Sequence, residues 1–387
     1  MAVRTFLVPP RLRLGEGSFA ELGLEAARLG RRALVVSGPQ TAAIGRTGAA
    51  VDLLRAAGLA AQAYSGVSQE PHLTHIYEGV QVGKALGADL VVGIGGGSAL
   101  DAAKAISAEL AGDLPIAACE GHDKVRAALP ILAVPTTAGT GSEVTRFTVV
   151  TRPGDGGAQV KMLIGSPLLI PQTALLDPEL IASAPPAAAA AAGIDALTHA
   201  IEAFVSDLAQ PLTDDLALSA IGRLAPRLQR AARGEAGPDD RSALLLGALE
   251  AGMAFSNASV ALVHGMARPL GAFFGVPHGV ANGLLLGTVV RFSREAAPAR
   301  YGRIAQAIGR GADAAQAVDE ICAECALPAP AAFGINPRSL GRAAPQMARD
   351  ALASGSPQHN PRLASSEEIE ALYAQALTPS AARTAFA

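Results

Sequence analysis

The sequence predicts an α/β domain followed by an all-α domain, and two observations lead to this fold class. From residue 31 to about residue 178, short apolar runs rich in β-branched residues alternate with amphipathic stretches. This alternation is typical of a mostly parallel sheet with helices on both faces. After Pro185 and Pro186, strand signals almost vanish and helical periodicity continues to the end of the chain. With 387 residues there is room for two domains, so we expect the first at residues 1–183 and the second at residues 184–387.

The elements of the first domain follow from local periodicity. Short, continuously apolar runs predict buried strands at residues 33–36, 90–94, 131–134 and 174–177. Helical spacing of apolar residues predicts helices at residues 41–57, 74–86 and 100–111.

The second domain is expected to consist of helices. An alanine-rich run, residues 187–192, leads into a helix that contains residues 195–205, because alanine has the highest helix propensity. Further helices are expected at residues 212–232, 240–255, 258–269, 280–292, 299–308 and 314–326. Residues 334–358 are rich in Gly, Pro, Ser and Arg, which predicts a loop with one short helix at residues 345–352. Ser365 is a typical N-cap for a last helix at residues 367–376.

Composition and charge narrow the possible partners and location. The net charge is −3, from 31 basic and 34 acidic residues, without a basic stripe. This argues against nucleic acid or an anionic membrane as partner. The N-terminal segment lacks the apolar region of a signal peptide, and no apolar run reaches the roughly 18 residues of a membrane span. We therefore expect a cytoplasmic protein. Cys322 and Cys325 have CxxC spacing, but they lie in a helical pattern without a second pair and are expected to be packing residues.

Four residues have the chemistry of a metal site: Asp195, His199, His264 and His278. Asp195 and His199 are four apart, so on a helix both side chains lie on one face. His264 and His278 are each followed by glycine, which allows the backbone to approach an ion or ligand closely. Three imidazoles and a carboxylate without a thiolate favour a divalent transition metal. Taken alone, the Asp195–His199 pair would more often be an ordinary pair on a helix face, and a single His-Gly motif would more often lie in a loop. The other histidines, His72, His75, His122 and His359, lie in polar or proline-flanked stretches and are expected to be solvated.

Two glycine-rich and hydroxyl-rich loops follow predicted strands. Gly95, Gly96, Gly97 and Ser98 connect a strand to the start of a helix, where backbone N–H groups and the helix dipole favour a phosphate. This turn differs from the GxGxxG fingerprint of dinucleotide-binding proteins, because Ser98 stands at the position of the third glycine. A turn with a purely structural role is the alternative. The second loop contains Thr136, Thr137, Thr140 and Ser142 and could also be a simple connection. Two such loops at one sheet edge favour a dinucleotide.

Together these motifs resemble the iron-dependent (group III) alcohol dehydrogenases. The resemblance covers nearly the whole chain and rests on the glycine turn with Asp101 and Lys104, the threonine loop up to Glu143, the Asp195–His199 pair, the two His-Gly motifs with Asn282, and Asn360 to Arg362 with the glutamates that follow. It implies a dehydroquinate-synthase-like fold, in which an α/β dinucleotide-binding domain and a helical metal-binding domain flank an active cleft. It also implies hydride transfer between NAD or NADP and a small primary alcohol or aldehyde.

The resemblance also assigns residues to roles. The metal ligands would be Asp195, His199, His264 and His278, binding Fe²⁺ by family likeness, with Zn²⁺ left open because intrinsic affinities favour it. The cofactor-binding residues would be Gly38, Gly95, Gly96, Gly97, Ser98, Asp101, Thr136, Thr137, Thr140 and Ser142, with Lys161 nearby. A homo-oligomer is expected. Phe147 and Phe255 would flank the cleft or belong to the core.

Two positions depart from the family pattern. NAD-preferring members commonly have an aspartate at the position of Gly38, where it would repel a 2′-phosphate, so glycine makes NADP admissible. Several relatives have a histidine at the position of Arg268, and it is often regarded as a proton relay. Arginine stays charged and cannot accept a proton. Either protons pass through ribose hydroxyls and water, or Arg268 holds a carboxylate, phosphonate or sulfonate of the substrate. An internal salt bridge in the helical domain is the third alternative.

Four other functions compete with this interpretation. A metal-free binding protein would not need four matched ligands together with two phosphate loops. A lyase of the dehydroquinate-synthase type shares the fold and NAD but has a different metal set and additional phosphate-binding cations. A glycerol-dehydrogenase-like polyol dehydrogenase stays open as a substrate variant, and maleylacetate reductase differs in its histidine motifs.

Overall fold

The computed structural model describes residues 3–68, 70–154 and 159–378, which form two compact units. One unit is Phe6–Ala184, and the other contains the described residues from Pro185 onward together with residues 3–5. The division falls one residue after the boundary expected from the sequence. Residues 3–5, which we placed in the first domain, group with the second because Arg4 Nη1 donates to the Leu208 carbonyl over 2.8 Å and Gln210 Nε2 donates to the Thr5 carbonyl over 3.3 Å.

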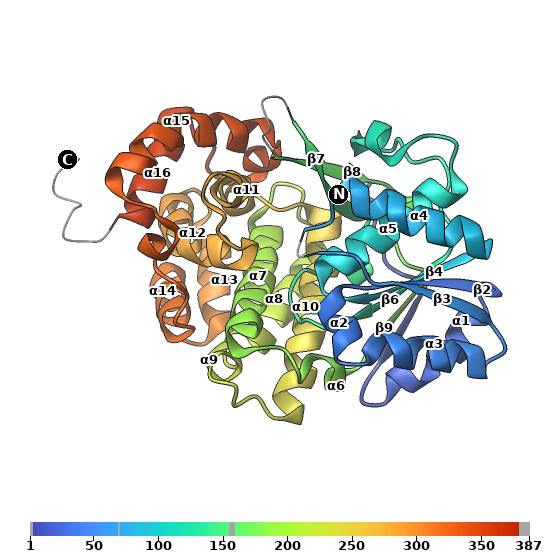
Figure 1. The fold of residues 1–387 in the computed structure, drawn as a ribbon. Coiled ribbons are helices and arrows are strands. Elements are labelled where there is room, and N and C mark those ends of the chain that lie inside the picture. The colour runs from blue at the N-terminus through green and yellow to red at the C-terminus, as the bar shows by residue number, and fades with distance from the viewer. Residues whose placement is uncertain (1–2, 69, 155–158, 379–387) are drawn as a thin grey trace. The chain divides into compact units, whose positions relative to one another are not determined.

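The first unit is built on a six-stranded parallel sheet in the order β1-β9-β6-β4-β2-β3 (Figure 1). Its strands are β1 (Arg11–Leu14), β2 (Arg32–Val36), β3 (Ala60–Tyr64), β4 (Leu90–Gly95), β6 (Ile131–Pro135) and β9 (Thr173–Leu176). All four predicted strands are present. The two strands missed by the sequence analysis, β1 and β3, form the edges of the sheet. Many of their residues are exposed, and no continuous apolar run develops.

Helices cover both faces of this sheet, as predicted. Ala33 and Val35 of β2 pack into the core under α1, α3 and α6, whereas Leu34 and Val36 pack under α4 and α5. The helices are α1 (Leu22–Ala26), α2 (Pro39–Ala43), α3 (Arg46–Ala56), α4 (Leu73–Leu86), α5 (Gly97–Ala111) and α6 (Pro178–Ile181). The single helix expected at residues 41–57 is two helices, because Gly45 adopts φ +80° and ends α2 before α3 begins.

A second, three-stranded sheet was not predicted. It pairs β7 (Phe147–Pro153) and β8 (Gln159–Gly165) in antiparallel register, with the two-residue strand β5 (Gly121–His122) parallel to β8. Val150, Met162 and Ile164 on these strands are fully buried in the same core as α4 and α5. This small sheet therefore adds to the covering of one face of the main sheet.

The second unit is helical, as predicted. Its helices are α7 (Pro186–Val205), α8 (Pro211–Leu224), α9 (Leu228–Ala232), α10 (Pro238–Ala258), α11 (Leu262–Phe274), α12 (His278–Ser293), α13 (Pro298–Ile308), α14 (Ala314–Glu324), α15 (Pro337–Ala353) and α16 (Ser366–Leu377). Among the described residues, α7 is the one single helix long and apolar enough to span a membrane, but 78% of its most apolar window is buried inside the protein. Core helices meet the same criterion, and α7 packs against α8, α10 and α12.

The prediction for residues 334–358 was wrong. In place of a loop with a short helix, the chain forms the 17-residue helix α15. Asn336 caps it by accepting from the backbone N–H groups of Arg338 and Ser339 over 3.1 and 3.0 Å. Leu340, Ala344, Met347, Ala348 and Ala351 form one buried face. Helical spacing therefore outweighs the Gly, Pro and Ser content of the segment, and Pro345 lies within the helix.

Helix boundaries differ at two other places. The expected helix at residues 212–232 divides into α8 and α9, and Pro226, which cannot donate a backbone hydrogen bond, lies between them. The expected start of a helix at Ala258 is wrong, because α10 extends to that residue and Ser259 then adopts φ +67°. The next helix, α11, continues past Pro269 to Phe274.

Candidate metal centre and nucleotide loops

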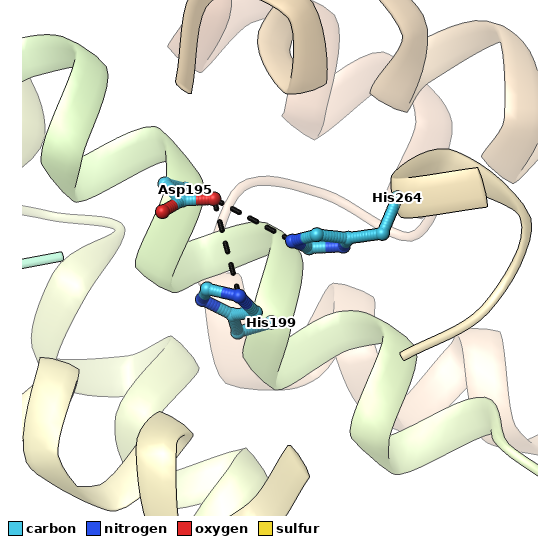
Figure 2. A group of neighbouring side chains, drawn as sticks. All are labelled: Asp195, His199 and His264. Atoms are coloured by element: carbon cyan, nitrogen blue, oxygen red, sulfur yellow. Dashed lines mark ion pairs between the residues drawn. The ribbon is translucent and has the colours of Figure 1, made fainter. Parts of the chain in front are cut away.

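Three of the predicted ligands converge in the helical unit (Figure 2). Asp195 and His199 project from one face of α7, and His264 points toward them from the first turn of α11. One ligand atom from each of the three lies within 4.8 Å of the others, and all three residues are buried. The Nε2 atoms of His199 and His264 are 4.0 and 3.5 Å from Asp195 Oδ1. The spacing argument for the Asp195–His199 pair therefore agrees with the geometry.

The fourth predicted ligand, His278, lies on the open side of this group. It is the first residue of α12, and its Nε2 is 3.6 Å from Asp195 Oδ1. Its side chain is 40% exposed, compared with 7% or less for the other three. Its ring is tilted 57° to that of His264 at a centroid distance of 5.2 Å. The four side chains thus form a cluster that is closed on three sides and accessible at His278.

Three neighbours hold the cluster in place, and two of them, Glu202 and Asn282, had no role assigned from the sequence. Glu202 accepts from the Val263 backbone N–H and pairs with His264 Nδ1, both over 2.5 Å. Asn282 Nδ2 donates to Asp195 Oδ1 over 2.6 Å. Phe255 stacks on His199 with ring centroids 4.1 Å apart. Glu202 and Asn282 could have been found from spacing, because each lies about one helical turn after a ligand on the same helix.

The charges of the cluster suit a cation. Burial lowers the pKa of His199 to about 3, although Asp195 opposes this, so the ring is neutral and keeps a lone pair. Burial alone would also lower the pKa of His264, but the Glu202 and Asp195 carboxylates raise it. Burial would raise the pKa of Asp195, but the surrounding imidazoles lower it and keep it ionised. A carboxylate and a neutral imidazole are the forms that bind metal ions.

The distances from the imidazole nitrogens to Asp195 fit a shared metal ion better than direct hydrogen bonds, while Asn282 Nδ2 lies 3.2 and 3.5 Å from the Nε2 atoms of His264 and His278. Three imidazole Nε2 atoms face one carboxylate oxygen at 3.5 to 4.0 Å, which is too long for hydrogen bonds. Two ligand atoms that are each about 2.1 Å from a tetrahedral ion are about 3.4 Å apart. The residues present therefore fit the divalent metal that the donor set predicts.

The two predicted phosphate loops are neighbours in the first unit. β4 and β6 are adjacent parallel strands with Gly95 opposite Pro135, and the Thr136 N–H donates to the Gly95 carbonyl over 2.9 Å. Gly95 adopts φ +147°, which favours glycine, and Gly96 is the N-cap residue of α5. A Cβ on Gly97 would come within 2.7 Å of Thr140 Cγ2. Glycine at position 97 therefore lets the turn and the threonine loop pack together at the N-terminus of α5.

These loops lie where open parallel sheets bind nucleotides. The chain passes from β2 to β3 on one side and then to β4 on the other, so the strand order reverses at β2. Gly38 follows β2 and Gly95 ends β4, so both are at carboxyl ends of strands next to this reversal. Dinucleotides bind in the crevice outside such a point. The assignment of individual cofactor contacts stays a prediction.

Asp101 and Ser142, both predicted cofactor residues, bind each other. Ser142 Oγ donates to Asp101 Oδ1 over 2.6 Å, and the Val149 backbone N–H donates to Asp101 Oδ2 over 3.0 Å. One turn further along α5, the buried Lys104 Nζ donates to the carbonyls of Thr145 and Phe147 over 2.9 and 2.8 Å. The two charged side chains thus tie α5 to the segment that follows the threonine loop.

Burial shifts the protonation of this network. It lowers the pKa of Lys104 to about 8, with Asp101 and Glu143 acting in the opposite direction. It raises the pKa of the neighbouring Glu143 to about 7, although a backbone hydrogen bond and Lys104 oppose the shift. In the unfolded chain, Lys104 would have its ordinary pKa of 10.5.

The Lys104→Met variant should therefore change the pH dependence of stability. Between about pH 8 and 10.5, the unfolded wild-type chain binds more protons at Lys104 than the folded chain does. The free energy of unfolding of the wild type therefore increases as the pH rises through this range. The difference in free energy of unfolding between the wild type and Lys104→Met should shift in favour of the wild type by on the order of 1 to 2 kcal/mol between pH 7.5 and about 9.5. Thermal melting at several pH values measures this difference. Lys84→Met, at an exposed position of α4, is the control. A constant difference between wild type and Lys104→Met would contradict the prediction.

The remaining predicted cofactor residues lie at separate positions. A Cβ on Gly38 would come within 2.9 Å of the Val67 carbonyl oxygen, so an aspartate there would require the backbone to move. The sequence alone could not place Arg31 and Arg32. Both lie at the amino end of β2, where their backbone N–H groups bind Asp89, so they are at the opposite end of the strand from Gly38. Lys161 lies on β8 and forms a 2.6 Å ion pair with Glu70.

The other candidate residues are also placed. Arg268 lies one turn after His264 on α11, partly buried, and its Nη1 donates to Ser356 Oγ over 3.0 Å. Burial lowers its pKa from the usual 12.5, with Glu202 opposing. Phe255 lies against His199, whereas Phe147 packs edge-on against His122 in the other unit. Of the histidines expected to be solvated, His359 instead pairs with Asp207 over 2.8 Å and is only 19% exposed.

The fold and the cluster together indicate a class of protein. A parallel-sheet unit with glycine-rich and threonine-rich loops, joined to a helical unit with a candidate Asp and His metal centre, is typical of metal-dependent dehydrogenases. Comparisons with known families agree. The model of the iron-containing alcohol dehydrogenases matches residues 9–178, and that of the C-terminal part of the Fe-containing alcohol dehydrogenase family matches residues 189–377. The chain belongs to the iron-containing alcohol dehydrogenase family. It is therefore an oxidoreductase of the alcohol and aldehyde class, and the lyase alternative is not supported.

Individual relatives cover most of the chain. It is 40% identical to a lactaldehyde reductase of Escherichia coli over 301 residues, which is 76% of this chain and 77% of the relative. The crystal structure of a 1,3-propanediol oxidoreductase is 33% identical, covers 97% of this chain and 100% of its own, and has a TM-score of 0.89. A sulfoacetaldehyde reductase from Bifidobacterium kashiwanohense in complex with NAD⁺ is 27% identical over 97% of this chain and 99% of its own, with a TM-score of 0.87. The predicted family and fold are confirmed.

Proposed function

We propose that the protein catalyses reversible hydride transfer between NAD(P)(H) and small primary alcohols or aldehydes, with a divalent metal ion bound by Asp195, His199, His264 and His278. The observation that carries this proposal is the convergence of three imidazole nitrogens on Asp195 Oδ1 at distances too long for hydrogen bonds. When bound, the ion would supply a Lewis acid for the substrate oxygen. In the oxidative direction, the alcohol loses a hydride to the nicotinamide and a proton to solvent. Family likeness favours Fe²⁺, and Zn²⁺ suits the same ligands.

The residues around the ligands have distinct tasks in this proposal. Glu202 accepts the Nδ1 proton of His264, which leaves the Nε2 lone pair facing Asp195. Asn282 fixes the Asp195 carboxylate through its amide. In the first unit, Gly96, Gly97 and Ser98 would bind the pyrophosphate through the N-terminus of α5, with Thr136, Thr137 and Thr140 beside it. Lys161, Asp101 and Ser142 are proposed as neighbours of the cofactor.

The proposed cofactor range includes NADP(H) as well as NAD(H). Position 38 has no carboxylate to repel a 2′-phosphate, and the clash of a Cβ with Val67 disfavours one there. A neighbour at 27% identity was solved with NAD⁺, which supports nicotinamide as the redox group. We infer a cytoplasmic homo-oligomer without nucleic-acid or membrane partners, in accordance with the charge and composition.

The direct test measures activity and metal content together. Protein purified without oxygen and loaded with Fe²⁺ or Zn²⁺ is assayed with lactaldehyde, 1,3-propanediol and short aldehydes, with both cofactors. We expect activity that depends on metal and a measurable rate with NADPH as well as NADH. Absence of activity with either metal and either cofactor would refute the proposed reaction. Catalytic efficiency strongly in favour of NADH would refute only the wider cofactor range.

A further inference from the structure

We propose that Arg268 binds an anionic group of the substrate, so that the preferred substrates are short aldehydes or alcohols that also carry a carboxylate or a sulfonate. This inference rests on the function proposed above and names its substrate class. It follows from the placement of Arg268, from its hydrogen bonds and from the charges around it.

Arg268 lies within reach of the candidate metal centre. It follows His264 by four residues on α11, so the two side chains leave the helix on neighbouring positions of one face, with Cβ atoms about 6 Å apart. The positive charge of Arg268 helps to lower the pKa of His199, a member of the cluster. The carboxylate of Glu202, which supports the cluster, opposes the lowering of the Arg268 pKa by burial. A substrate with its oxygen at the centre could therefore present a second group to Arg268 if about two to four carbons separate the two.

The guanidinium lacks a counter-ion. Within the described ranges of the chain, no carboxylate lies within 4.0 Å of the Arg268 nitrogens, and the one hydrogen bond it donates goes to the neutral Ser356 Oγ. Glu202 is not its contact partner: the two carboxylate oxygens bind Val263 N and His264 Nδ1, and no ion pair within 4.0 Å joins Glu202 to Arg268. Among the residues that the structure describes, four of the five guanidinium N–H donors thus have no protein acceptor.

A structural role does not require the positive charge. The bond to Ser356 links α11 to the short 3₁₀ helix at Ser356–His359, and a neutral amide could donate the same bond. A partly buried cation without a partner is unfavourable, so an anion from outside would improve the local free energy. A planar fork of N–H donors matches the two oxygens of a carboxylate, or two of a sulfonate. The geometry and the charge therefore favour a substrate anion.

The test compares acidic and neutral aldehydes of equal length on the metal-loaded enzyme: succinic semialdehyde with butanal, and glutaric semialdehyde with pentanal. We expect the wild type to prefer the acid of at least one pair by about tenfold or more in kcat/KM. Arg268→Gln should lower kcat/KM for that acid by about 10- to 100-fold and change the neutral partner less than about fivefold. Arg268→Lys, which keeps the charge but loses the fork, should fall between wild type and Arg268→Gln.

Controls separate this inference from folding and from the proposed function. Arg342→Gln, at an exposed position of α15, should behave as wild type. Competitive inhibition of the wild type by propanoate, compared with propanol, gives a binding readout that does not depend on any variant. Equal losses on acid and neutral substrates, or a wild type that prefers the neutral member of both pairs, would overturn the role of Arg268. A wild type inactive on all four aldehydes with both cofactors would instead refute the proposed function.

Discussion

The Asp195→Asn variant is expected to lose most of its bound metal and to lower kcat/KM roughly a thousandfold, because a Lewis acid is worth several kcal/mol of barrier. The change is nearly isosteric and removes only the charge. The Asp195 oxygen that accepts from Asn282 Nδ2 has a counterpart in the asparagine side chain, so this contact can persist. Three imidazoles would then remain around a neutral amide, which is a much weaker ligand than a carboxylate.

The measurement combines elemental analysis of the purified protein with steady-state kinetics. Asp215→Asn, an exposed position on α8 in the same unit, is the matched control and should retain both metal and activity. Thermal melting of the metal-free proteins shows whether the variant folds. An Asp195→Asn protein with wild-type metal content would show that Asp195 is not a ligand.

The Gly279→Ala variant is expected to lower the melting temperature by roughly 10 °C and kcat/KM about 100-fold. A Cβ on Gly279 would lie 2.1 Å from the Ala191 carbonyl oxygen and 2.6 Å from its carbon. These are backbone atoms of α7, so no rotamer change relieves the clash. The first turn of α12 would have to move away from α7, and that turn carries His278 and leads to Asn282.

Gly302→Ala is the control for this substitution. Gly302 lies within α13, and a Cβ there would meet nothing within 4 Å. Alanine should be neutral or slightly stabilising at this position because it has the higher helix propensity. If Gly279→Ala melts within about 2 °C of wild type, the close packing of α12 on α7 does not restrain His278 as described.

The elements that position the candidate centre could be predicted because each depends on local sequence. The buried strands of the main sheet are continuously apolar, and the Asp195–His199 pair follows from the 3.6-residue repeat of one helix. The glycine turn was recognisable since a strand, three glycines and a helix follow one another directly. For the edge strands and α15, exposed positions and unusual composition masked the periodicity.

What the sequence could not supply is the set of interactions between distant segments. Glu202 is on α7, but its partners Val263 and His264 are some sixty residues further along the chain. Lys104 binds carbonyl groups of Thr145 and Phe147, which have no side-chain signature at all. Such interactions arise from tertiary packing, which a residue pattern does not encode.

The network around Asp101 and Lys104 has a consequence for the strength of nucleotide binding. Because these side chains hold residues 142–149 against α5, the part of the loop that leads into β7 is tied down by side-chain hydrogen bonds without a nucleotide. Binding then sacrifices little conformational entropy of the loop, so more of the interaction free energy is retained as affinity. Asp101 and Lys104 would thus lower the dissociation constant of a nucleotide by ordering the loop before it binds.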